Sequence, residues 1–313
     1  MANAHRPFAT SGFVIRGQKI PDRFVGEFQD SSGIDDPHQL QLRLADDGYI
    51  FLRGVLDQGE VLAARKEVFA RLVQVDEIEP PAIKGIATGR SRRRELAGDL
   101  IQFWRSVSEG PALRQVTHGR CVKALMATLF DEPARPQDYL WLRPRGVGWS
   151  TGLHFDHPFF ARGSQRVHSV WIPLGDVPLC DGPLMLVENS NKFLDLIDPM
   201  HDQDEQANRD PATAERFAFD GEWGNAVDFV TKRKTRLLSA EFSAGDVLVF
   251  DMNTLHGSLD NHSPIGRVRL SCDVRYQPAS DQLDERYFGA NPTGASGQGY
   301  GDMNSCKPMN EVS

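Results

Sequence analysis

Two histidines and an aspartate are spaced along the chain in a way that suits a metal ion. His154 and Asp156 are two residues apart in the stretch STGLHFD, which has the length and composition of a strand. Side chains alternate between the faces of a strand, so this imidazole and this carboxylate point the same way, while Phe155 and His157 point to the other face. His256 ends a later predicted strand, GDVLVFDMNTLH, and is the leading candidate for a third ligand.

Two imidazoles and one carboxylate on one face of an octahedral ion leave three positions open for a cosubstrate and O2. This is the ligand set of non-haem Fe(II) oxygenases. The alternative is a coincidental trio that serves turns and core hydrogen bonds. Other histidines favour structural roles: His157 by its parity, His168 as a hydrogen-bonding group on a neighbouring strand, and His262 in a solvated turn.

An arginine near the third candidate ligand fits the same chemistry. Arg267 lies eleven residues after His256, at the start of RVRLSCDVRY. If GSLDNHSPIG forms the turn, the two strands run antiparallel and bring Arg267 back toward the metal. A planar guanidinium grips a carboxylate through two hydrogen bonds, which suits the far carboxylate of 2-oxoglutarate. Arg269 has the same parity and is the alternative.

The elements that must position these residues divide the chain into a helical part and a β-rich part. Residues 1–37 are expected to form an N-terminal arm that wraps the domain or is partly disordered, and residues 38–135 to be mainly helical. A strand is predicted from Tyr49 to Leu56. Apolar residues recur at helical spacing from Gln58 to about Val75 and from Pro111 to Phe130, which predicts a helix in each range.

Short apolar or alternating runs then predict an antiparallel sheet system over residues 136–280, which needs closure or a second sheet to protect its edges. The polar residues 191–238 read as a long inserted loop, of a length that is usually functional or mobile. The basic run from Gly89 to Leu96 reads as a solvated helix start, and the Gly-rich tail, residues 289–313, as poorly packed and flexible. The predicted strands are DYLWLRP, STGLHFD, VHSVWIPL, GPLMLVEN, GDVLVFDM and RVRLSCDVRYQ.

Composition limits the class of protein. With 313 residues, 40% of them hydrophobic and 25% charged, the chain has the make-up of a soluble globular protein. A net charge of −8 argues against nucleic acid as a partner, because binding phosphates needs a basic field. Four cysteines without a CxxC pair suit reduced thiols and a cytoplasmic location. Neither an apolar leader nor a membrane-length apolar run occurs, so we expect an unexported protein that crosses no membrane.

The order of these motifs resembles the phytanoyl-CoA dioxygenase family of Fe(II)/2-oxoglutarate-dependent oxygenases. The resemblance rests on HxD at His154, then VWIPLGDVPLCDGPLMLVENSNK, then GDVLVFDMNTLHGSLDNHSPIGRVRLSCDVRY, and extends over roughly residues 40 to 280. HxD alone is a weak signal. HxD with a distant HGS and an arginine eleven residues beyond that histidine is a specific one.

The resemblance implies a fold and a set of roles. The fold is a double-stranded β-helix, or jelly roll, flanked by helices, in a single oxygenase domain over residues 38–288. The cofactors are Fe(II), 2-oxoglutarate as cosubstrate, and O2, and Arg267 is expected to bind the C5 carboxylate of 2-oxoglutarate. Thr151 stands where a glutamine is common in relatives. The implied metal ligands are His154, Asp156 and His256, and the implied cosubstrate contacts are Arg267, Ser258, Trp171 and Thr151.

These roles predict a dioxygenase that hydroxylates a C–H bond of a small organic molecule and releases succinate and CO2. Asp156 fills the position that is vacant in radical halogenases, so hydroxylation is favoured over halogenation, with desaturation, epoxidation or ring rearrangement as variants. The alternatives are an acyl-CoA 2-hydroxylase and a catalytically silent jelly-roll metal-binding protein. Four arginines flank the predicted site and indicate either an anionic substrate or solvated loops: Arg143, Arg145, Arg162 and Arg166.

Overall fold

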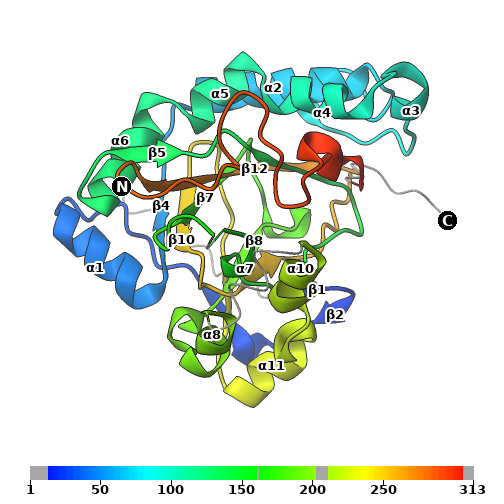
Figure 1. Cartoon of the computed structure of the whole chain (residues 1–313). Coiled ribbons are helices and arrows are strands. Elements are labelled where there is room, and N and C mark those ends of the chain that lie inside the picture. The colour runs from blue at the N-terminus through cyan, green and yellow to red at the C-terminus, as the bar shows by residue number, and fades with distance from the viewer. Residues whose placement is uncertain (1–12, 161, 202–210, 306–313) are drawn as a thin grey trace, which may run out of the picture.

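Two β-sheets lie between two groups of helices in the computed structural model, which describes residues 13–160, 162–201 and 211–305. Helices from the first part of the chain cover one side of the strands, and helices from residues 194–233 lie on the opposite side of the molecule (Figure 1). This is the jelly roll with flanking helices that the resemblance implied, so the predicted fold class is confirmed.

The larger sheet has the strand order β4-β10-β7-β12-β5, and β6 also pairs with β12. Every pairing in this sheet is antiparallel. Because β12 is the longest strand, it pairs with β7 on one side and with both β5 and β6 on the other. The strands are β4 (Tyr49–Leu52), β5 (Ala134–Pro136), β6 (Trp141–Arg145), β7 (His168–Pro173), β10 (Val247–Asp251) and β12 (Arg269–Pro278).

The smaller sheet has the strand order β11-β8-β9-β3. Its outer strand β3 comes from the segment expected as an N-terminal arm and pairs in parallel with β9. A hairpin of β1 and β2 precedes it. The strands are β1 (Val14–Ile15), β2 (Gln18–Lys19), β3 (Val25–Glu27), β8 (Leu184–Val187), β9 (Leu237–Ser239) and β11 (His256–Ser258).

The space between the sheets has an apolar part and a polar part. The apolar part is an aromatic cluster that includes Phe51, Trp171 and Phe250 from the larger sheet and Leu186 from the smaller one. On β12, the residues that face the helices belong to the helix-side apolar core, whereas those paired with the inward-facing side of β7 are polar. These inward residues are Ser271, Asp273 and Arg275, and Arg269 lies on the same face of β12, where it pairs with β6.

The helices begin where the sequence provides capping residues. Asp36, Asp57, Asp99 and Asn225 precede α1, α2, α4 and α11, and each side chain accepts a hydrogen bond from a backbone N–H in the first turn. Gly48 ends α1 in the left-handed conformation, at a φ of 77°, which turns the chain into β4. The helices before the sheets are α1 (Pro37–Asp47), α2 (Gln58–Val73), α3 (Arg93–Leu96), α4 (Leu100–Ser108), α5 (Pro111–Thr117) and α6 (Arg120–Phe130).

The single helix predicted from Pro111 to Phe130 is wrong, because the chain breaks there into α5 and α6. His118 leaves the helical conformation, with a φ of −115° and a ψ of 7°. A Cβ on Gly119 would lie 2.0 Å from the backbone oxygen of Gln115, so the corner requires glycine. Apolar residues continue at helical spacing across the break, and the periodicity therefore does not reveal it.

We expect this corner to make the protein less stable in acid. Burial, reinforced by Arg114, lowers the pKa of His118 from 6.5 to about 4. The unfolded chain therefore binds the proton more readily than the folded one, and the free energy of unfolding falls as the pH decreases from 6.5 toward 4. His118→Gln should remove roughly 1–2 kcal/mol of the stability difference between pH 7 and pH 4.5, allowing for partial exposure. Urea unfolding of both proteins at the two pH values measures this, and an identical pH dependence would contradict it.

The segment 191–238, expected as a long loop, is mainly helical over its described residues. The helices pack through apolar residues such as Ile197, Trp223 and Phe229 into a cluster that also contains Met185 and Val187 of β8. Polar residues of these helices such as Asp195, Asp198 and Asp228 are exposed. The segment contains α8 (Leu194–His201), α10 (Pro211–Phe219) and α11 (Ala226–Arg233), and its end enters β9; α7 (His157–Phe160) comes before it.

The Gly-rich tail is packed more closely than its composition suggests. Tyr300 is 2% exposed, and its ring stacks on that of Tyr139 at 4.9 Å between centroids. The 3-10 turn that carries it, Gly299–Ser305, lies against α4 (Figure 1). The prediction of a poorly packed tail is therefore wrong for this part.

One arginine of the basic run is also buried. Arg93 forms a two-point ion pair with Glu77, at 2.6 Å from Nε to Oε1 and 2.9 Å from Nη2 to Oε2. Both side chains are almost fully enclosed. The run is thus more than a solvated helix start, because one member anchors α3 to the loop after α2.

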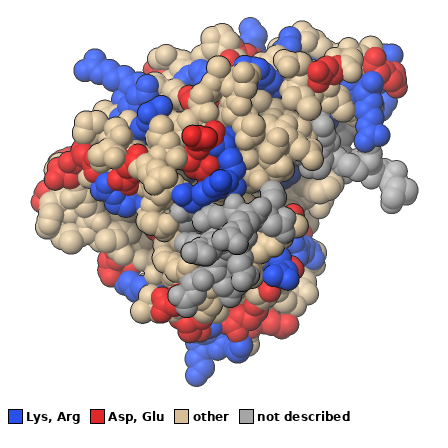
Figure 2. All heavy atoms as spheres, in the orientation of Figure 1, with Lys and Arg blue, Asp and Glu red and all other residues tan. Residues whose placement is uncertain are grey.

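Basic and acidic side chains are interspersed on the visible face of the molecule (Figure 2). Ion pairs on the surface of the protein include Arg233 with Asp195 and Arg236 with Glu188. Among the helices that the structure describes, none is both long and apolar enough to span a membrane.

Candidate metal centre and substrate cavity

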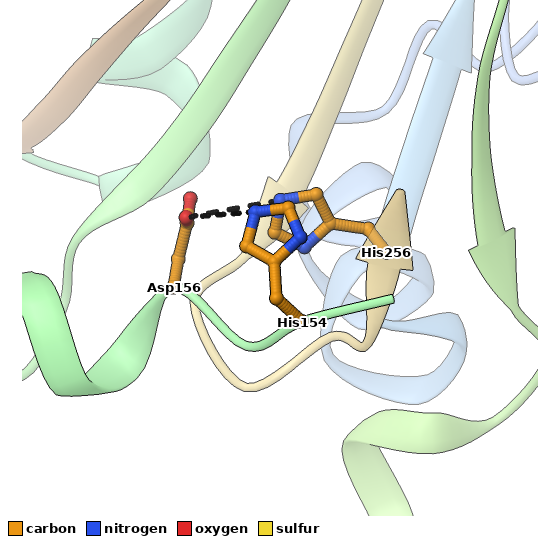
Figure 3. Close-up of side chains that lie close together, drawn as sticks. All are labelled: His154, Asp156 and His256. Atoms are coloured by element: carbon orange, nitrogen blue, oxygen red, sulfur yellow. Dashed lines mark ion pairs between the residues drawn. The ribbon is translucent and has the colours of Figure 1, made fainter. Parts of the chain in front are cut away.

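His154, Asp156 and His256 come together in the interior, although β11 is far from the other two along the chain. One ligand atom from each lies within 4.8 Å of the others, and all three residues are buried. Asp156 Oδ1 lies 4.0 Å from His154 Nε2 and 3.7 Å from His256 Nε2. Figure 3 shows the carboxylate directed toward both imidazoles. Among the described residues this is the cluster with the donors and spacing to hold a metal ion.

Backbone pairing fixes the two histidines beside each other. His154 N–H donates to His256 O at 2.8 Å, and His256 N–H donates to His154 O at 3.0 Å. A Cβ on the next residue, Gly257, would lie 2.7 Å from the backbone oxygen of Thr151, so glycine allows the two segments to approach. This single bridge therefore places the imidazole rings of His154 and His256 next to each other, at 4.1 Å between centroids.

The strands predicted through these residues are only partly correct. Residues 150–156 form no continuous strand but pair at one bridge, and Asp156 directly precedes α7. β10 ends at Asp251, and His256 starts β11 in the other sheet rather than ending the same strand. The predicted parity nevertheless holds, because Phe155 packs into the apolar cluster outside the smaller sheet, edge-on to Trp223 at 5.0 Å.

Hydrogen bonds on the far side of each imidazole set its orientation. His154 Nδ1 lies 3.0 Å from Gly152 O, and His256 Nδ1 lies 2.9 Å from Thr254 O. A backbone oxygen only accepts, so each Nδ1 carries the hydrogen and each Nε2 presents a lone pair toward Asp156. That is the tautomer a metal ligand needs.

The electrostatics of the three groups favour the same protonation states. Burial and the neighbouring His256 lower the pKa of His154 to about 3, and burial lowers that of His256. Burial alone would raise the pKa of Asp156, but Arg275 and the two histidines outweigh it and hold that pKa well below its usual range. At neutral pH the site therefore offers two neutral imidazoles and one carboxylate.

The structure separates the two candidate arginines. Arg267 lies at the edge of a different groove with Arg65 and Lys84, and its Nε is 3.3 Å from Asp181 Oδ2. Arg269 lines a second, buried pocket beside His256, the inner pocket, whose wall also contains His154, Trp171 and Ser258. The expected placement of Arg267 is wrong because β12 begins at Arg269, so Arg267 precedes the strand and bridges to Ile86 instead.

Arg269 is a fully enclosed cation whose hydrogen bonds go to neutral groups. Its Nε donates to Gly182 O at 3.1 Å, and its Nη1 donates to Ser271 Oγ at 2.6 Å. Among the described residues no carboxylate lies within 4 Å of its guanidinium, and burial with nearby Arg145 lowers its pKa to about 9. A buried cation without an anionic partner is unfavourable, so the pocket suits an anionic ligand.

The remaining predicted contacts line the same inner pocket. Ser258 and Trp171 lie on its wall together with Thr151 and His154. Ser258 Oγ accepts a hydrogen bond of 2.8 Å from the Thr151 backbone N–H. The structure thus gathers Ser258, Trp171 and Thr151 at the triad, and leaves Arg267 outside.

A second cavity of about 290 Å³, the outer cavity, is lined by His154 and Asp156 and shares Arg143, Thr151 and His154 with the inner pocket. Arg143 and Arg145 of β6 lie on one wall, and aromatic rings form much of the rest. The segment 191–238 contributes Phe219, whose ring stacks on His154 at 4.7 Å, and Glu215, and the tail contributes Ala295 and Ser296. The aromatic lining residues are Trp141, Phe159, Phe160 and Phe219.

The remaining histidines considered as candidates, and the other two flanking arginines, lie outside the metal site and the cavity. His157 is buried and stacks on His201 at 4.0 Å, and His168 stacks on Phe130 at 5.0 Å. His262 is about half exposed. Arg166 pairs with Asp281 and with Glu132 on the surface. Arg162 is exposed as well.

The sequence interpretation missed three polar residues around Asp156. Arg275 and Ser169 both donate hydrogen bonds to its carboxylate, and Asp273 Oδ2 lies 3.7 Å from Arg275 Nη1. A signal was present, since polar residues alternate with apolar ones throughout RLSCDVR at positions 269–275. In a buried strand, a polar or charged residue at every second position indicates a functional face.

Comparison with known proteins places the chain among oxygenases. The family model for phytanoyl-CoA dioxygenase (PhyH) matches residues 44–268. A 1-deoxypentalenic acid 11-beta-hydroxylase of Streptomyces arenae is 26% identical over 259 residues, which are 79% of this chain and 83% of the relative. The enzyme of the same name from Streptomyces exfoliatus is 25% identical over 262 residues, with the same coverage.

A solved structure supports the fold. The non-haem α-ketoglutarate-dependent carbocyclase SnoK from nogalamycin biosynthesis aligns with a TM-score of 0.51 and 18% identity, covering 81% of this chain and 89% of its own. At this identity the likeness shows the fold alone. The family match, in contrast, covers well over half of the chain. The chain therefore belongs to the phytanoyl-CoA dioxygenase family of Fe(II)- and 2-oxoglutarate-dependent oxygenases.

Proposed function

We propose that this oxygenase hydroxylates a C–H bond of a small anionic molecule, with 2-oxoglutarate and O2 as cosubstrates and succinate and CO2 as coproducts. His154, Asp156 and His256 would hold Fe(II). One observation carries the proposal: the three residues line two adjoining spaces. The first is a pocket that contains the buried Arg269, which is hydrogen-bonded to neutral groups, and the second is a cavity large enough for a small molecule. When bound, Fe(II) supplies the open positions at which 2-oxoglutarate and O2 react.

The side chains of the inner pocket would bind and orient the cosubstrate. Arg269 would receive the distal carboxylate of 2-oxoglutarate, because it is enclosed and, among the described residues, its hydrogen bonds go to neutral groups while Asp273 acts on it only from a greater distance. Ser258 lies on the same wall and can donate its hydroxyl hydrogen to that carboxylate while its oxygen accepts from Thr151. Trp171 would form the apolar side of the pocket and exclude water.

The outer cavity would bind the substrate beside the triad. Its aromatic rings suit an apolar body, and the two arginines of β6 suit a carboxylate or a similar anion. Both arginines line the cavity, so we assign the substrate anion to this pair. Arg145 is the one to replace in a test, because its loss leaves the 3.0 Å hydrogen bond from Arg143 Nε to Asp273 Oδ2 in place. The related hydroxylases described above are named for an acid, 1-deoxypentalenic acid, which agrees with an anionic substrate.

Two alternatives are less well supported. An acyl-CoA 2-hydroxylase would have to bind most of its substrate outside a cavity of about 290 Å³. A catalytically silent metal-binding protein would have no use for a buried, unpaired Arg269 beside the metal ligands. Activity on a CoA thioester but not on the free acid would favour the first alternative.

The direct test is turnover of 2-oxoglutarate. Purified protein with Fe(II) and ascorbate under air is expected to form succinate, and more of it when a suitable acid fills the cavity. Metal-free protein and protein under argon serve as controls. Absence of any Fe(II)- and O2-dependent succinate formation across a broad panel of acids would contradict the proposed enzyme.

The anionic substrate leads to a separate prediction. Small carboxylic acids with a compact apolar body should stimulate succinate formation more than their methyl esters. Arg145→Met should reduce the stimulation by an acid about tenfold to a hundredfold, the loss expected for a hydrogen bond to a charged group. Arg166→Met, a surface arginine outside the cavity, is the matched control and should leave it unchanged. Equal stimulation by acids and esters would show that the cavity does not select for charge.

A further inference from the structure

The two oxygens of the Asp156 carboxylate have different surroundings. Oδ2 accepts a hydrogen bond of 2.6 Å from Ser169 Oγ and one of 3.0 Å from Arg275 Nη2. Oδ1 is 3.4 Å from the same Nη2 but faces the imidazoles of His154 and His256. One oxygen is therefore held by two donors, and the other is directed into the candidate metal site.

The two donors are held in place by the sheet itself. Ser169 of β7 and Arg275 of β12 are directly opposite in the strand register, so their side chains emerge side by side on the same face. Ser169 is 1% exposed and Arg275 is 2% exposed. Their position depends on the larger sheet and not on the loop that carries Asp156.

Packing leaves the Arg275 guanidinium little freedom to move. It lies over the Phe160 ring at 4.6 Å and near the Trp141 ring at 5.5 Å. Its Nη1 is 3.7 Å from Asp273 Oδ2. A planar group enclosed in this way presents its N–H groups in fixed directions.

The consequence concerns how many metal positions the aspartate occupies. A carboxylate that binds through both oxygens occupies two coordination positions of an octahedral ion. Together with two histidines it would leave only two coordination positions open. Cosubstrate and O2 together need three. We propose that Ser169 and Arg275 are positioning residues that hold Asp156 Oδ2 away from the metal, so that the aspartate binds through Oδ1 alone and the third open position is kept.

This inference rests on the proposed metal site, and it predicts opposite effects on two ligands. Without Ser169, Oδ2 is freer to turn toward the metal. In Ser169→Ala, Mn(II), used as a redox-silent probe, should bind as tightly as in the wild type or more tightly. 2-Oxoglutarate should bind the Mn(II)-loaded protein about three- to tenfold more weakly, which is the effect of one hydrogen bond.

Arg275→Gln extends the test. Removing a positive charge beside the site should tighten Mn(II) binding, while 2-oxoglutarate should bind at least tenfold more weakly, because a hydrogen bond to a charged group that holds Asp156 is lost. Because Ser169→Ala leaves the charge unchanged, weaker 2-oxoglutarate binding in that variant cannot be an electrostatic effect.

The control is a buried arginine of the same kind away from the site. Arg93→Gln breaks the enclosed pair with Glu77 and should lower stability without changing either dissociation constant. Calorimetric titrations of Mn(II), and then of 2-oxoglutarate, measure all four proteins. If Ser169→Ala leaves 2-oxoglutarate binding unchanged, or weakens the binding of Mn(II) and of 2-oxoglutarate equally, the proposed positioning role is wrong. If the wild type binds no Mn(II), the metal site itself is wrong.

Discussion

Replacing any one of the three candidate ligands is expected to abolish turnover of 2-oxoglutarate. His154→Ala, His256→Ala and Asp156→Asn should each lower Fe(II)-dependent succinate formation by roughly a thousandfold or more. The reason is that a bound metal contributes several kcal/mol to the reaction, and each 1.36 kcal/mol is a factor of ten in rate. The same variants should lose Mn(II) binding in calorimetry, which separates loss of metal from loss of a later step.

The choice of Asp156→Asn rather than alanine follows from the surroundings of the carboxylate. Arg275 and Ser169 both donate to Oδ2. Asparagine can still accept these hydrogen bonds, so the variant should remain folded while it loses the negative charge. Circular dichroism and the melting temperature check this point.

His157→Gln is the matched control for the histidines. His157 directly follows Asp156 but stacks on His201 and lies outside the ligand cluster. Succinate formation by this variant should stay within about threefold of the wild type, a change of less than 1 kcal/mol. Unchanged turnover in Asp156→Asn or His154→Ala would show that these residues are not the metal ligands.

The second large effect is expected at Arg269. Removing one partner of a buried, hydrogen-bonded charge pair typically loses 2–5 kcal/mol, so Arg269→Met should raise the KM for 2-oxoglutarate roughly a hundredfold or more. Arg269→Lys keeps the charge but loses the planar fork, and should give an intermediate value. The dissociation constant of 2-oxoglutarate for the Mn(II)-loaded protein should change in parallel.

Arg267→Met provides the comparison within the same chain. Arg267 pairs with the buried Asp181 and lines another groove, outside the inner pocket. Its loss should therefore change the KM for 2-oxoglutarate by no more than about twofold, which is less than about 0.5 kcal/mol. The opposite result, with a large effect at Arg267 and none at Arg269, would return cosubstrate binding to Arg267. Two arginines that are two residues apart are thus distinguished by one measurement.

Local sequence patterns were sufficient for the parts of the fold that depend on near neighbours. Apolar spacing predicted α2 from Gln58, and short apolar or alternating runs predicted the core of β7, β8, β10 and β12. The parity of His154 and Asp156, with Phe155 on the other face, also follows from neighbouring residues. The Gly119 corner was missed because its cause is a steric contact with Gln115 that periodicity does not report.

The sequence by itself determined the donor types of the site, their common face and the family to which their order belongs. Only the tertiary structure decided which arginine reaches the inner pocket, because that depends on where β12 begins and not on distance from His256. It also brought Ser169 and Arg275 to Asp156 through the pairing of β7 with β12. Strand register joins residues about a hundred positions apart, and no local pattern in one chain encodes such a contact.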